Sequence, residues 1–447
     1  MTADGLRLHP FRGLRYVPGK VSGLAAVTSP PYDVVVRPDG LHHLECADPY
    51  NIVRLILPHA GPPAARHRQA AATLRRWRRE GVLATDPVPA VYVYEQRRGD
   101  VLQRGLIGAL RLSPPEAGVV LPHEDVIAEV VAERADLMRQ LGANPEPLLL
   151  SYRGSDPGRA DARGAAAAAV ERATARTPLL STTTEDGFAH RLWALTDPAE
   201  LAAVQADLST RRALIADGHH RWATYLRLRD EQRAAPGADE SGPARGSFWE
   251  YGLVLLVDTD RYPLHVHAIH RVLPQLPLAR ALHAVEAAGA FRIRSFDGPP
   301  SRAFAALGTG GALDGLDPAT GTAFVLTDGG PVCHLLDRPA PRLLDRALDG
   351  RPASWRQLDA AVLHSVLLDE VWRIPDRPAA VGYLHDAGTA VEQAAKRGGT
   401  AVLMRPVREE TVRALAEEGV TMPRKSTSFG PKPATGLVLR ALDGTDD

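Results

Sequence analysis

The pattern of hydrophobic residues along the chain predicts strands and helices in a mixed order. Residues 90–96 and 105–112 are expected to form two β-strands paired around an Arg-Arg-Gly-Asp turn. Apolar residues at helical spacing predict a helix over 124–141, and the apolar run at 146–152 predicts a short buried strand. Further helices are expected over 63–80, over 155–178, near 197–207 and over 221–233.

The second half of the chain alternates between the two element types. Further strands are expected over 251–258 and 262–273, and from about residue 275 strands and helices follow one another up to a helix at 409–419. This alternation is typical of an α/β unit in which helices cover a sheet. We therefore predict a mixed α/β (α+β) fold in three regions: 1–115, 116–274 and 275–447.

Composition narrows the class of protein. The 447 residues are 45% hydrophobic and 24% charged, with 53 basic and 53 acidic side chains. This balance does not favour nucleic acid or an anionic membrane as partner, and no signal peptide or membrane span is recognised. Cys46 and Cys333 lie far apart, which fits the cytoplasm and excludes a cysteine-based zinc site. A flexible loop is expected over 235–246. A homodimer is possible from the sequence, which does not decide the oligomeric state.

The stretch IADGHHRWAT, residues 215–224, places charged side chains where a strand gives way to a helix. Gly218 allows a tight turn, and the first N–H groups of the helix would face an anion. His219, His220 and Arg221 would add donors for phosphate, and Asp217 would hold Mg²⁺ beside it. The alternative is that Asp217 caps the helix and the histidines form internal hydrogen bonds.

Lysine is rare in this chain. Only four of the 53 basic residues are lysines, and two of them, Lys425 and Lys432, lie in the short segment MPRKSTSFGPKPATG. The lysine side chain ends in a compact ammonium group, whereas the arginine side chain ends in a planar guanidinium group. The segment is therefore a candidate clamp for phosphate or carboxylate, and chance placement is the alternative.

Two further segments carry candidate site residues. TSPPYDVV presents Tyr32 and Asp33 from a proline-stiffened loop, either for a ligand or as a structural turn. LPHEDV places Glu124 at the expected start of the helix over 124–141, as a cap or as a general base. Arg134, further along that helix, would line the same cleft or form a surface ion pair with Glu133.

The stretch HVHAIHR could serve a different chemistry. His265 and His267 share one face of an expected strand, and Arg271 returns to that face. Two histidines at this spacing can bind a metal if a third ligand comes from elsewhere. A metal-dependent hydrolase is therefore an alternative function.

Seven ordered motifs give the chain a family resemblance. They are HPFRGLRY, SPPYDVV, DPYNIVRLILP, HEDV, IADGHHR, IHRVL and MPRKSTSFGPKPATGLV. Together they resemble a bacterial family known as domain of unknown function 1015, from about residue 8 to 440. The strand–DGHHR–helix unit is more distantly similar to the nucleotide-binding box of the ParB/sulfiredoxin-like superfamily, which includes free-serine kinases.

The distant resemblance implies a ParB/sulfiredoxin-like core with an additional C-terminal α/β unit. It implies a phosphotransferase that uses ATP or ADP with Mg²⁺ and a small hydroxyl acceptor such as serine. Asp217, Glu124 and His220 would be catalytic, and Tyr32, Asp33, Arg134 and Arg271 would bind the acceptor. Phosphate would be bound by Gly218, His219, His220, Arg221, Lys425 and Lys432. A nucleotide-binding regulatory module without transfer activity is the main alternative.

Overall fold

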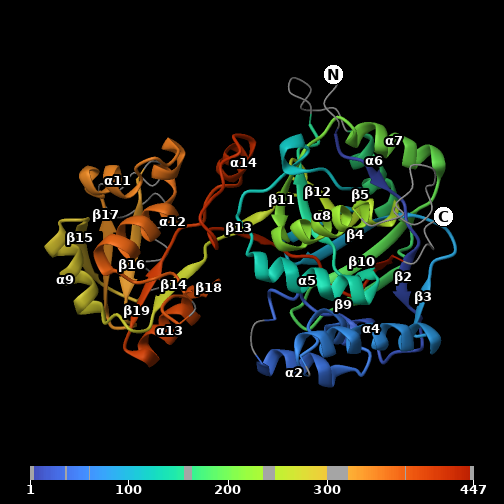
Figure 1. Cartoon of the computed structure of the whole chain (residues 1–447), viewed down its shortest axis with the longest axis horizontal. Coiled ribbons are helices and arrows are strands. Elements are labelled where there is room, and N and C mark those ends of the chain that lie inside the picture. The colour runs from blue at the N-terminus through green and yellow to red at the C-terminus, as the bar shows by residue number, and fades with distance from the viewer. Residues whose placement is uncertain are drawn as a thin grey trace. The chain divides into compact units, whose positions relative to one another are not determined.

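The chain forms two compact units in a computed structural model that describes residues 5–35, 38–59, 61–155, 164–234, 247–299, 321–377 and 379–442. The first unit comprises Met1–Pro122, Val126–Leu264 and Pro431–Asp447, and the second comprises His123–Asp125 and His265–Gly430. Most of the second unit is thus an insertion in the chain of the first (Figure 1). The loop expected over 235–246 lies outside the described residues.

The first unit is built on a nine-stranded sheet. Its strands lie in the order β6 (Val120–Leu121), β11 (Ala213–Asp217), β8 (Leu148–Tyr152), β12 (Tyr251–Asp258), β5 (Val101–Arg111), β4 (Val91–Arg98), β10 (Ala189–Leu195) and β9 (Leu180–Thr183), and β1 (Leu8–His9) also pairs with β5. β11 runs parallel to β6 and antiparallel to β8, while β8 and β12 are parallel. All residues of β8 and β11 are buried, which explains their unbroken apolar pattern.

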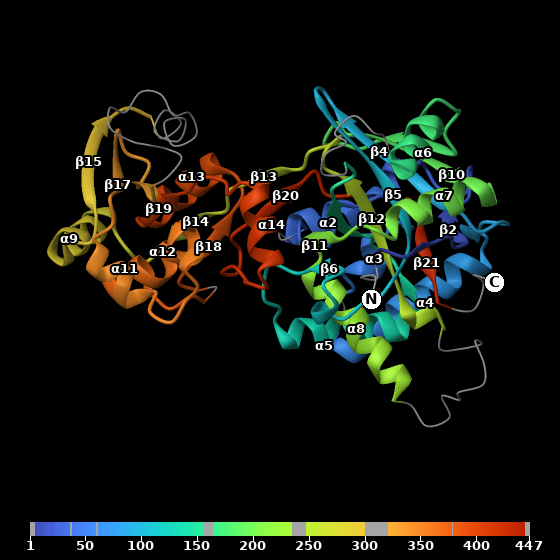
Figure 2. The same cartoon turned by 90° about the horizontal axis from the view of Figure 1, so that it is seen from above.

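Helices and a smaller sheet complete the first unit. The helices are α1 (Leu24–Val27), α2 (Pro38–Ala47), α3 (Val53–Ile56), α4 (Pro63–Arg79), α5 (Ala128–Leu141), α6 (Ala165–Thr174), α7 (Pro198–Leu208) and α8 (His219–Arg233), with short 3₁₀ turns at Pro115–Ala117 and Ser247–Glu250. The small sheet has the order β3 (Leu83–Thr85), β2 (Gly13–Tyr16), β21 (Leu439–Ala441) and β7 (Ala143–Asn144). β21 returns from the far end of the chain to pair with β2 (Figure 2).

The second unit contains a six-stranded antiparallel sheet. Its order is β15 (Arg292–Asp297), β17 (Val332–Asp337), β16 (Ala323–Thr327), β19 (Thr400–Leu403), β14 (His270–Leu273) and β18 (Gly382–Leu384). β13 (His265–His267) and β20 (Ser428–Gly430) form a separate pair. The helices are α9 (Leu278–Ala288), α11 (Pro341–Ala347), the 3₁₀ helix η3 (Ala353–Gln357), α12 (Asp359–Val362), the π-helix η4 (Leu363–Trp372), α13 (Ala387–Arg397) and α14 (Glu409–Glu417).

Both faces of the second sheet are covered. Phe324 and Leu326 of β16 belong to one core cluster with residues of α9 and η4. Val325, between them, belongs to another cluster with Ala390 and Ala394 of α13. Alternate residues of a strand point to opposite faces, so helices pack on both sides of the sheet, as the strand–helix alternation predicted.

Several expected elements are confirmed and others are displaced. The hairpin of β4 and β5 and the helix from residue 63 are where the sequence predicts them. The helix expected from residue 124 begins at Ala128, because Glu124 pairs in extended conformation with Met422. The single strand expected over 262–273 is two strands in different sheets, β13 and β14.

The three predicted regions can be compared with the two units. Strands on both sides of the expected border at residue 115, such as β5 and β12, pair in one sheet. The change of unit at Leu264 lies near the expected border at 274.

Among the described residues, none of the helices combines the length and apolarity needed to cross a bilayer.

The substitution Leu255→Ala tests the core of the first unit. Leu255 lies in β12 and is fully buried, so the truncation removes apolar contacts and leaves a cavity. We expect the free energy of unfolding to fall by about 3 kcal/mol, measured by urea denaturation. Val88→Ala is the control, because Val88 is 51% exposed and its loss should change stability little. Equal effects of the two substitutions would contradict this packing.

Candidate functional site

The junction of β11 and α8 forms a helix start without a side-chain cap in the first unit. Gly218 has φ 102° and ψ 31°, which glycine adopts without strain. The backbone N–H of Trp222 donates to the Gly218 carbonyl at 2.9 Å, which starts the helix. Among the described residues, no side chain caps α8, so the N–H groups of its first turn carry the positive end of the helix dipole. Asp217 is therefore not the cap that the alternative interpretation required.

Asp217 binds two cations. Its Oδ1 lies 2.5 Å from Nζ of Lys432, and its Oδ2 accepts a hydrogen bond of 2.5 Å from Nη2 of Arg221. A register shift in β11 between Ile215 and Asp217 sets the direction of this last residue. With both oxygens engaged by cations, the arrangement does not fit Asp217 as a Mg²⁺ ligand.

Arg221 is directed into the protein. Its side chain is 1% exposed, and besides Asp217 it donates to the carbonyl of Pro147 at 3.0 Å. A Cβ atom on Gly218 would lie 3.1 Å from Nε of Arg221, so glycine makes room for the guanidinium as well as for the turn. Arg221 supports the helix end in this arrangement, and its predicted contact with phosphate stays a prediction.

The proline-stiffened loop contributes Asp33 and Tyr32 to the same group. Oδ2 of Asp33 lies 2.5 Å from Nζ of Lys432, so this ammonium group bridges two carboxylates. Oδ1 of Asp33 is buried and has no hydrogen-bond partner among the described residues. The Tyr32 ring stacks against Arg134, whose Cζ lies 3.9 Å from the ring centroid.

Glu146 was not predicted from the sequence. It is 3% exposed, directly precedes the Pro147 that binds Arg221, and accepts a hydrogen bond of 2.9 Å from the Tyr32 backbone N–H. Because β8 runs antiparallel to β11, the residues just before β8 lie beside the end of β11. In the sequence, the only sign of this residue was the single carboxylate in NPEPLLL. No local pattern there indicates that Glu146 lies near Asp217.

Burial and charge shift the pKa values of this cluster in different directions. Burial acts to raise the pKa of Asp217, but Lys432 and Arg221 outweigh it and lower that pKa. Burial acts to lower the pKa of Lys432, yet Asp217 and Asp33 raise it. For Glu146 burial prevails and raises the pKa, against the opposing effect of Arg221 and Arg134. Burial also raises the pKa of Tyr32, to about 12.

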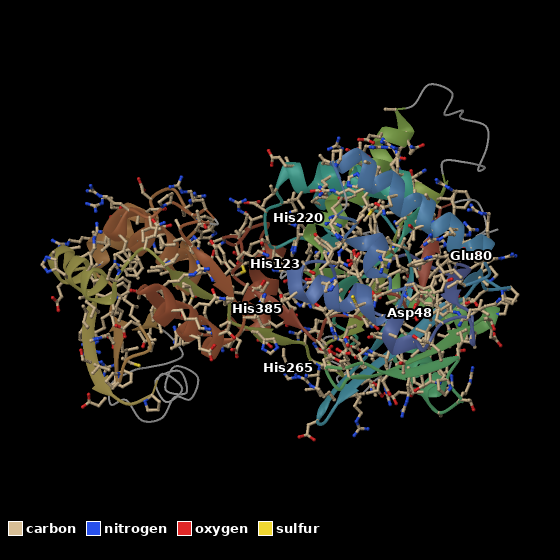
Figure 3. All side chains as sticks on the ribbon, turned by 90° about the horizontal axis from the view of Figure 1, so that it is seen from below. Asp48, Glu80, His123, His220, His265 and His385 are labelled. Carbon is tan, nitrogen blue, oxygen red and sulfur yellow. The ribbon has the colours of Figure 1, made fainter. Side chains whose placement is uncertain are left out.

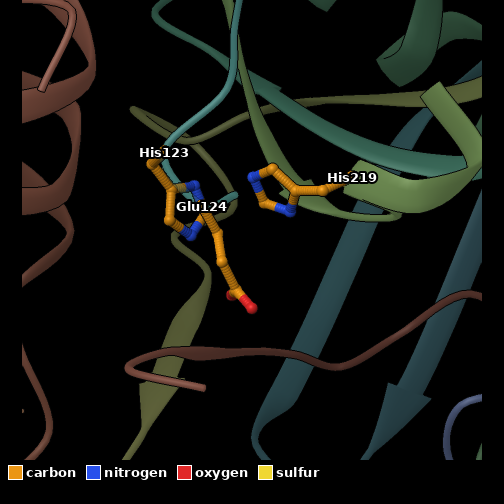
Figure 4. A group of neighbouring side chains, drawn as sticks. All are labelled: His123, Glu124 and His219. Atoms are coloured by element: carbon orange, nitrogen blue, oxygen red, sulfur yellow. The ribbon is translucent and has the colours of Figure 1, made fainter. Parts of the chain in front are cut away.

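The two histidines of the motif differ in their surroundings. His219 is the first residue of α8 and is 8% exposed (Figure 4). His220, labelled in Figure 3, accepts a hydrogen bond at Nε2 from the backbone N–H of Ile127 at 3.0 Å. This bond connects the first turn of α8 to the residue that precedes α5. His220 therefore has a structural contact, and its catalytic role stays a prediction.

The remaining candidates lie in the second unit. Glu124 Oε1 accepts a hydrogen bond of 3.1 Å from the backbone N–H of Lys425, whose φ is 58°. Arg271 is fully buried and donates to the Lys425 carbonyl at 3.0 Å. Burial lowers the pKa of Arg271 to about 10. The three residues thus form one hydrogen-bonded group in which the Lys425 backbone is the link.

Arg271 also joins a polar network within that unit. Its Nη2 lies 3.2 Å from Nε2 of His364 in the π-helix, and its Cζ lies 4.6 Å from the ring centroid of Tyr383. The Tyr383 hydroxyl donates to Asp376, whose other carboxylate oxygen lies 3.5 Å from Nδ1 of His364. The sequence contained these residues without any motif that connects them.

The predicted histidine pair does not gain a third ligand. His265, labelled in Figure 3, and His267 are exposed in β13, with ring centroids 6.4 Å apart. Among the described residues, no third metal-binding side chain joins them. Their spacing alone therefore does not build a metal centre.

Comparisons with known proteins place the chain in a family. The model of a family described as "Protein of unknown function (DUF1015)" matches residues 8–361, which stops short of the motifs expected up to about residue 440. No curated protein sequence matches the chain significantly.

Similarity to solved structures is low. A free serine kinase in complex with AMP is 14% identical, with 71% of this chain and 88% of that chain covered and a TM-score of 0.32. A conserved hypothetical protein from Pyrococcus furiosus is 13% identical, with 73% and 93% covered and a TM-score of 0.34. SbnI from Staphylococcus aureus, with a C-terminal truncation, is 10% identical, with 76% and 90% covered and a TM-score of 0.36.

The substitution Lys432→Met tests the bridging ammonium group. It leaves Asp33 and Asp217 close together in a largely buried site without the cation that they share. We expect the free energy of unfolding at pH 7 to fall by about 3 kcal/mol, measured by urea denaturation. Lys20→Met is the control, because Lys20 is exposed.

The pH dependence of stability gives a second readout of the same variant. The pKa of Asp217 is lowered in the folded protein, so its contribution is present above about pH 4 and is lost as the pH falls through the folded pKa. In Lys432→Met, burial should instead raise the carboxylate pKa values, and protonation should relieve the repulsion. The stability difference between the two proteins should therefore shrink from pH 7 to pH 5. A constant difference would show that Lys432 acts by packing alone.

Proposed function

We propose that this chain, which belongs to the DUF1015 family, is a nucleotide-dependent phosphotransferase acting on the hydroxyl group of a small molecule. Free serine or a similar amino acid is the proposed acceptor, and ATP or ADP is the proposed donor. The observation that carries this proposal is the uncapped first turn of α8, which begins at a glycine with positive φ beside a cluster of buried charges. Such a helix end favours negatively charged oxygen atoms. A ParB/sulfiredoxin-like core belongs to the same proposal.

The α8 end would bind the phosphates of the nucleotide. The backbone N–H groups of the first turn and the imidazoles of His219 and His220 would be the donors. Gly218 permits the positive φ of this turn and leaves room for the Arg221 guanidinium behind it. Arg221 would support this end indirectly, through its bonds to Asp217 and to the Pro147 carbonyl.

The acceptor would bind at the proline-stiffened loop. The Oδ1 atom of Asp33, buried without a partner among the described residues, fits an acceptor of a hydrogen bond from a ligand N–H or O–H group. Lys432 would hold the Asp33 carboxylate in a fixed direction through its other oxygen. The predicted roles of Tyr32, Arg134, Lys425 and Arg271 in binding the acceptor or the phosphates stay predictions.

Glu124 is the proposed general base. In the transfer, the acceptor oxygen forms a bond to the terminal phosphorus while the bond from that phosphorus to the nucleotide oxygen breaks. The hydroxyl proton passes to the Glu124 carboxylate, and the shortened nucleotide leaves. The hydrogen bond from the Lys425 N–H holds one oxygen of this carboxylate in place. No step is assigned to Mg²⁺ bound by Asp217, whose oxygens bind Lys432 and Arg221.

A regulatory module that binds a nucleotide without transferring phosphate is the second candidate. The pairing of Glu124 with a backbone N–H favours it, because a carboxylate held in this way can be structural. Both candidates predict nucleotide binding, and only the kinase predicts a phosphorylated acceptor.

The decisive experiment crosses nucleotides with amino acids. Purified full-length protein is incubated with each nucleotide and acceptor in the presence of Mg²⁺, and phosphorylated products are detected by mass spectrometry. We expect Glu124→Gln to bind nucleotide with unchanged affinity and to lose transfer by about 100-fold or more. Glu129→Gln is the matched control, because Glu129 is exposed in the first turn of α5. Nucleotide binding without any phosphorylated product would favour the regulatory module, and absence of nucleotide binding would refute both candidates.

A further inference from the structure

A cavity lies within the first unit, and none of its lining residues belongs to α8. Its volume is about 430 Å³, which is in the range of small-molecule sites. Its lining residues come from the loop before α2, from α2, from the segment after α3, and from α4 and α5. α4 packs on both α3 and α5, so the cavity is set among helices. Figure 1 shows α4 and α5 of this group.

Arg134 supplies the cavity with a positive charge. Its Nη1 donates to the Ile56 carbonyl at 2.7 Å, and the face of its guanidinium stacks on Tyr32. Among the described residues, no carboxylate lies within ion-pair distance of Arg134. The stacking covers a face of the planar group, whereas the N–H bonds point from its edges. Arg134 is thus fixed in place with donors left for an anion.

The other charged residues of the lining are already paired. Nη2 of Arg66 lies 2.7 Å from Oε1 of Glu133, so these two charges cancel. The cavity therefore keeps a net positive charge from Arg134. An anionic ligand would balance this charge, and a cationic ligand would be repelled.

His67 is a buried polar group that faces the cavity without a partner. It is 3% exposed, lines the cavity and makes no hydrogen bond to any residue that the structure describes. Burial lowers the pKa of His67, so its ring is neutral near pH 7 and offers one donor and one acceptor. A buried polar group without a partner is costly unless a ligand or water satisfies it.

His59 also lines the cavity, with its Nδ1 3.7 Å from Oε1 of Glu45, and the remaining lining residues are apolar. Val35, Leu41, Leu57 and Leu137 line the cavity together with Pro58. Such a wall favours the hydrocarbon part of a ligand, whereas Arg134 and His67 favour a carboxylate. We propose that this cavity binds a small monocarboxylate with an aliphatic or aromatic body.

This site does not depend on the proposed phosphotransfer. The proposed acceptor, serine, has no hydrocarbon body that would cover the four aliphatic side chains of the wall. Arg134 connects the two sites, because the Tyr32 ring on which it stacks belongs to the loop that carries Asp33. Binding of a carboxylate and binding of a nucleotide can therefore be measured separately on the same protein.

The test is a calorimetric titration of the full-length protein with matched pairs of ligands. Hexanoate is compared with hexanamide, and benzoate with benzamide, so that only the charge of the head group differs. We expect each carboxylate to bind about tenfold or more tightly than its amide, because the amide cannot form the ion pair with Arg134. ATP is titrated in parallel and should not displace hexanoate.

Two substitutions locate the binding. Arg134→Gln removes the cation and should weaken hexanoate binding by about tenfold or more while affecting hexanamide little. Leu57→Trp fills the cavity from a half-buried position and should abolish binding of both. Arg75→Gln is the matched control for charge, because Arg75 is exposed in α4 outside the lining. Circular dichroism and thermal melting confirm that each variant is folded.

Three outcomes would overturn the proposal. The first is that no carboxylate binds at millimolar concentration. The second is that carboxylate and amide bind equally well, which would leave Arg134 without a role. The third is that hexanoate binding survives both Leu57→Trp and Arg134→Gln, or is displaced by ATP, which would place it elsewhere. None of these outcomes bears on whether the protein transfers phosphate.

Discussion

One ammonium group connects three distant segments of the first unit. Nζ of Lys432 lies 2.5 Å from a carboxylate oxygen of Asp33 and 2.5 Å from one of Asp217. Without a shared cation, these two largely buried carboxylates would repel each other, and one of them would take up a proton. Lys432 thus fixes the proline-stiffened loop, the end of β11 and the C-terminal segment in one arrangement. The first turn of α8 directly follows Asp217 and Gly218 in the chain.

The positive charge beside Asp217 comes from side chains of the chain itself. Sequence reasoning identified the need for a cation beside Asp217 and assigned Mg²⁺ to it. The structure supplies Lys432 on one side and Arg221 on the other. A local motif cannot show this, because Lys432 is far from Asp217 in the chain and approaches it only after folding. The scarcity of lysine was the single hint in the sequence.

Features that depend on local pattern were predictable. The β4–β5 hairpin, the helix from residue 63 and the strand–turn–helix at Gly218 follow from periodicity and from glycine chemistry. Features that depend on neighbouring segments were not. Glu146 reaches the site through antiparallel pairing, and the helix expected from residue 124 starts later because Glu124 pairs with Met422. The inward direction of Arg221 follows from the Pro147 carbonyl, which no sequence pattern reveals.

The return of the chain to the first unit at residue 431 has a consequence for biosynthesis. A ribosome releases the strands that flank the place of β21, and both carboxylates, long before it releases Lys432. The inserted unit is contiguous from His265 to Gly430, so almost all of its residues emerge before the first unit can be closed. The position between β2 and β7 can therefore be filled, and the two carboxylates can pair with Lys432, only after the segment from residue 431 onward has been synthesised.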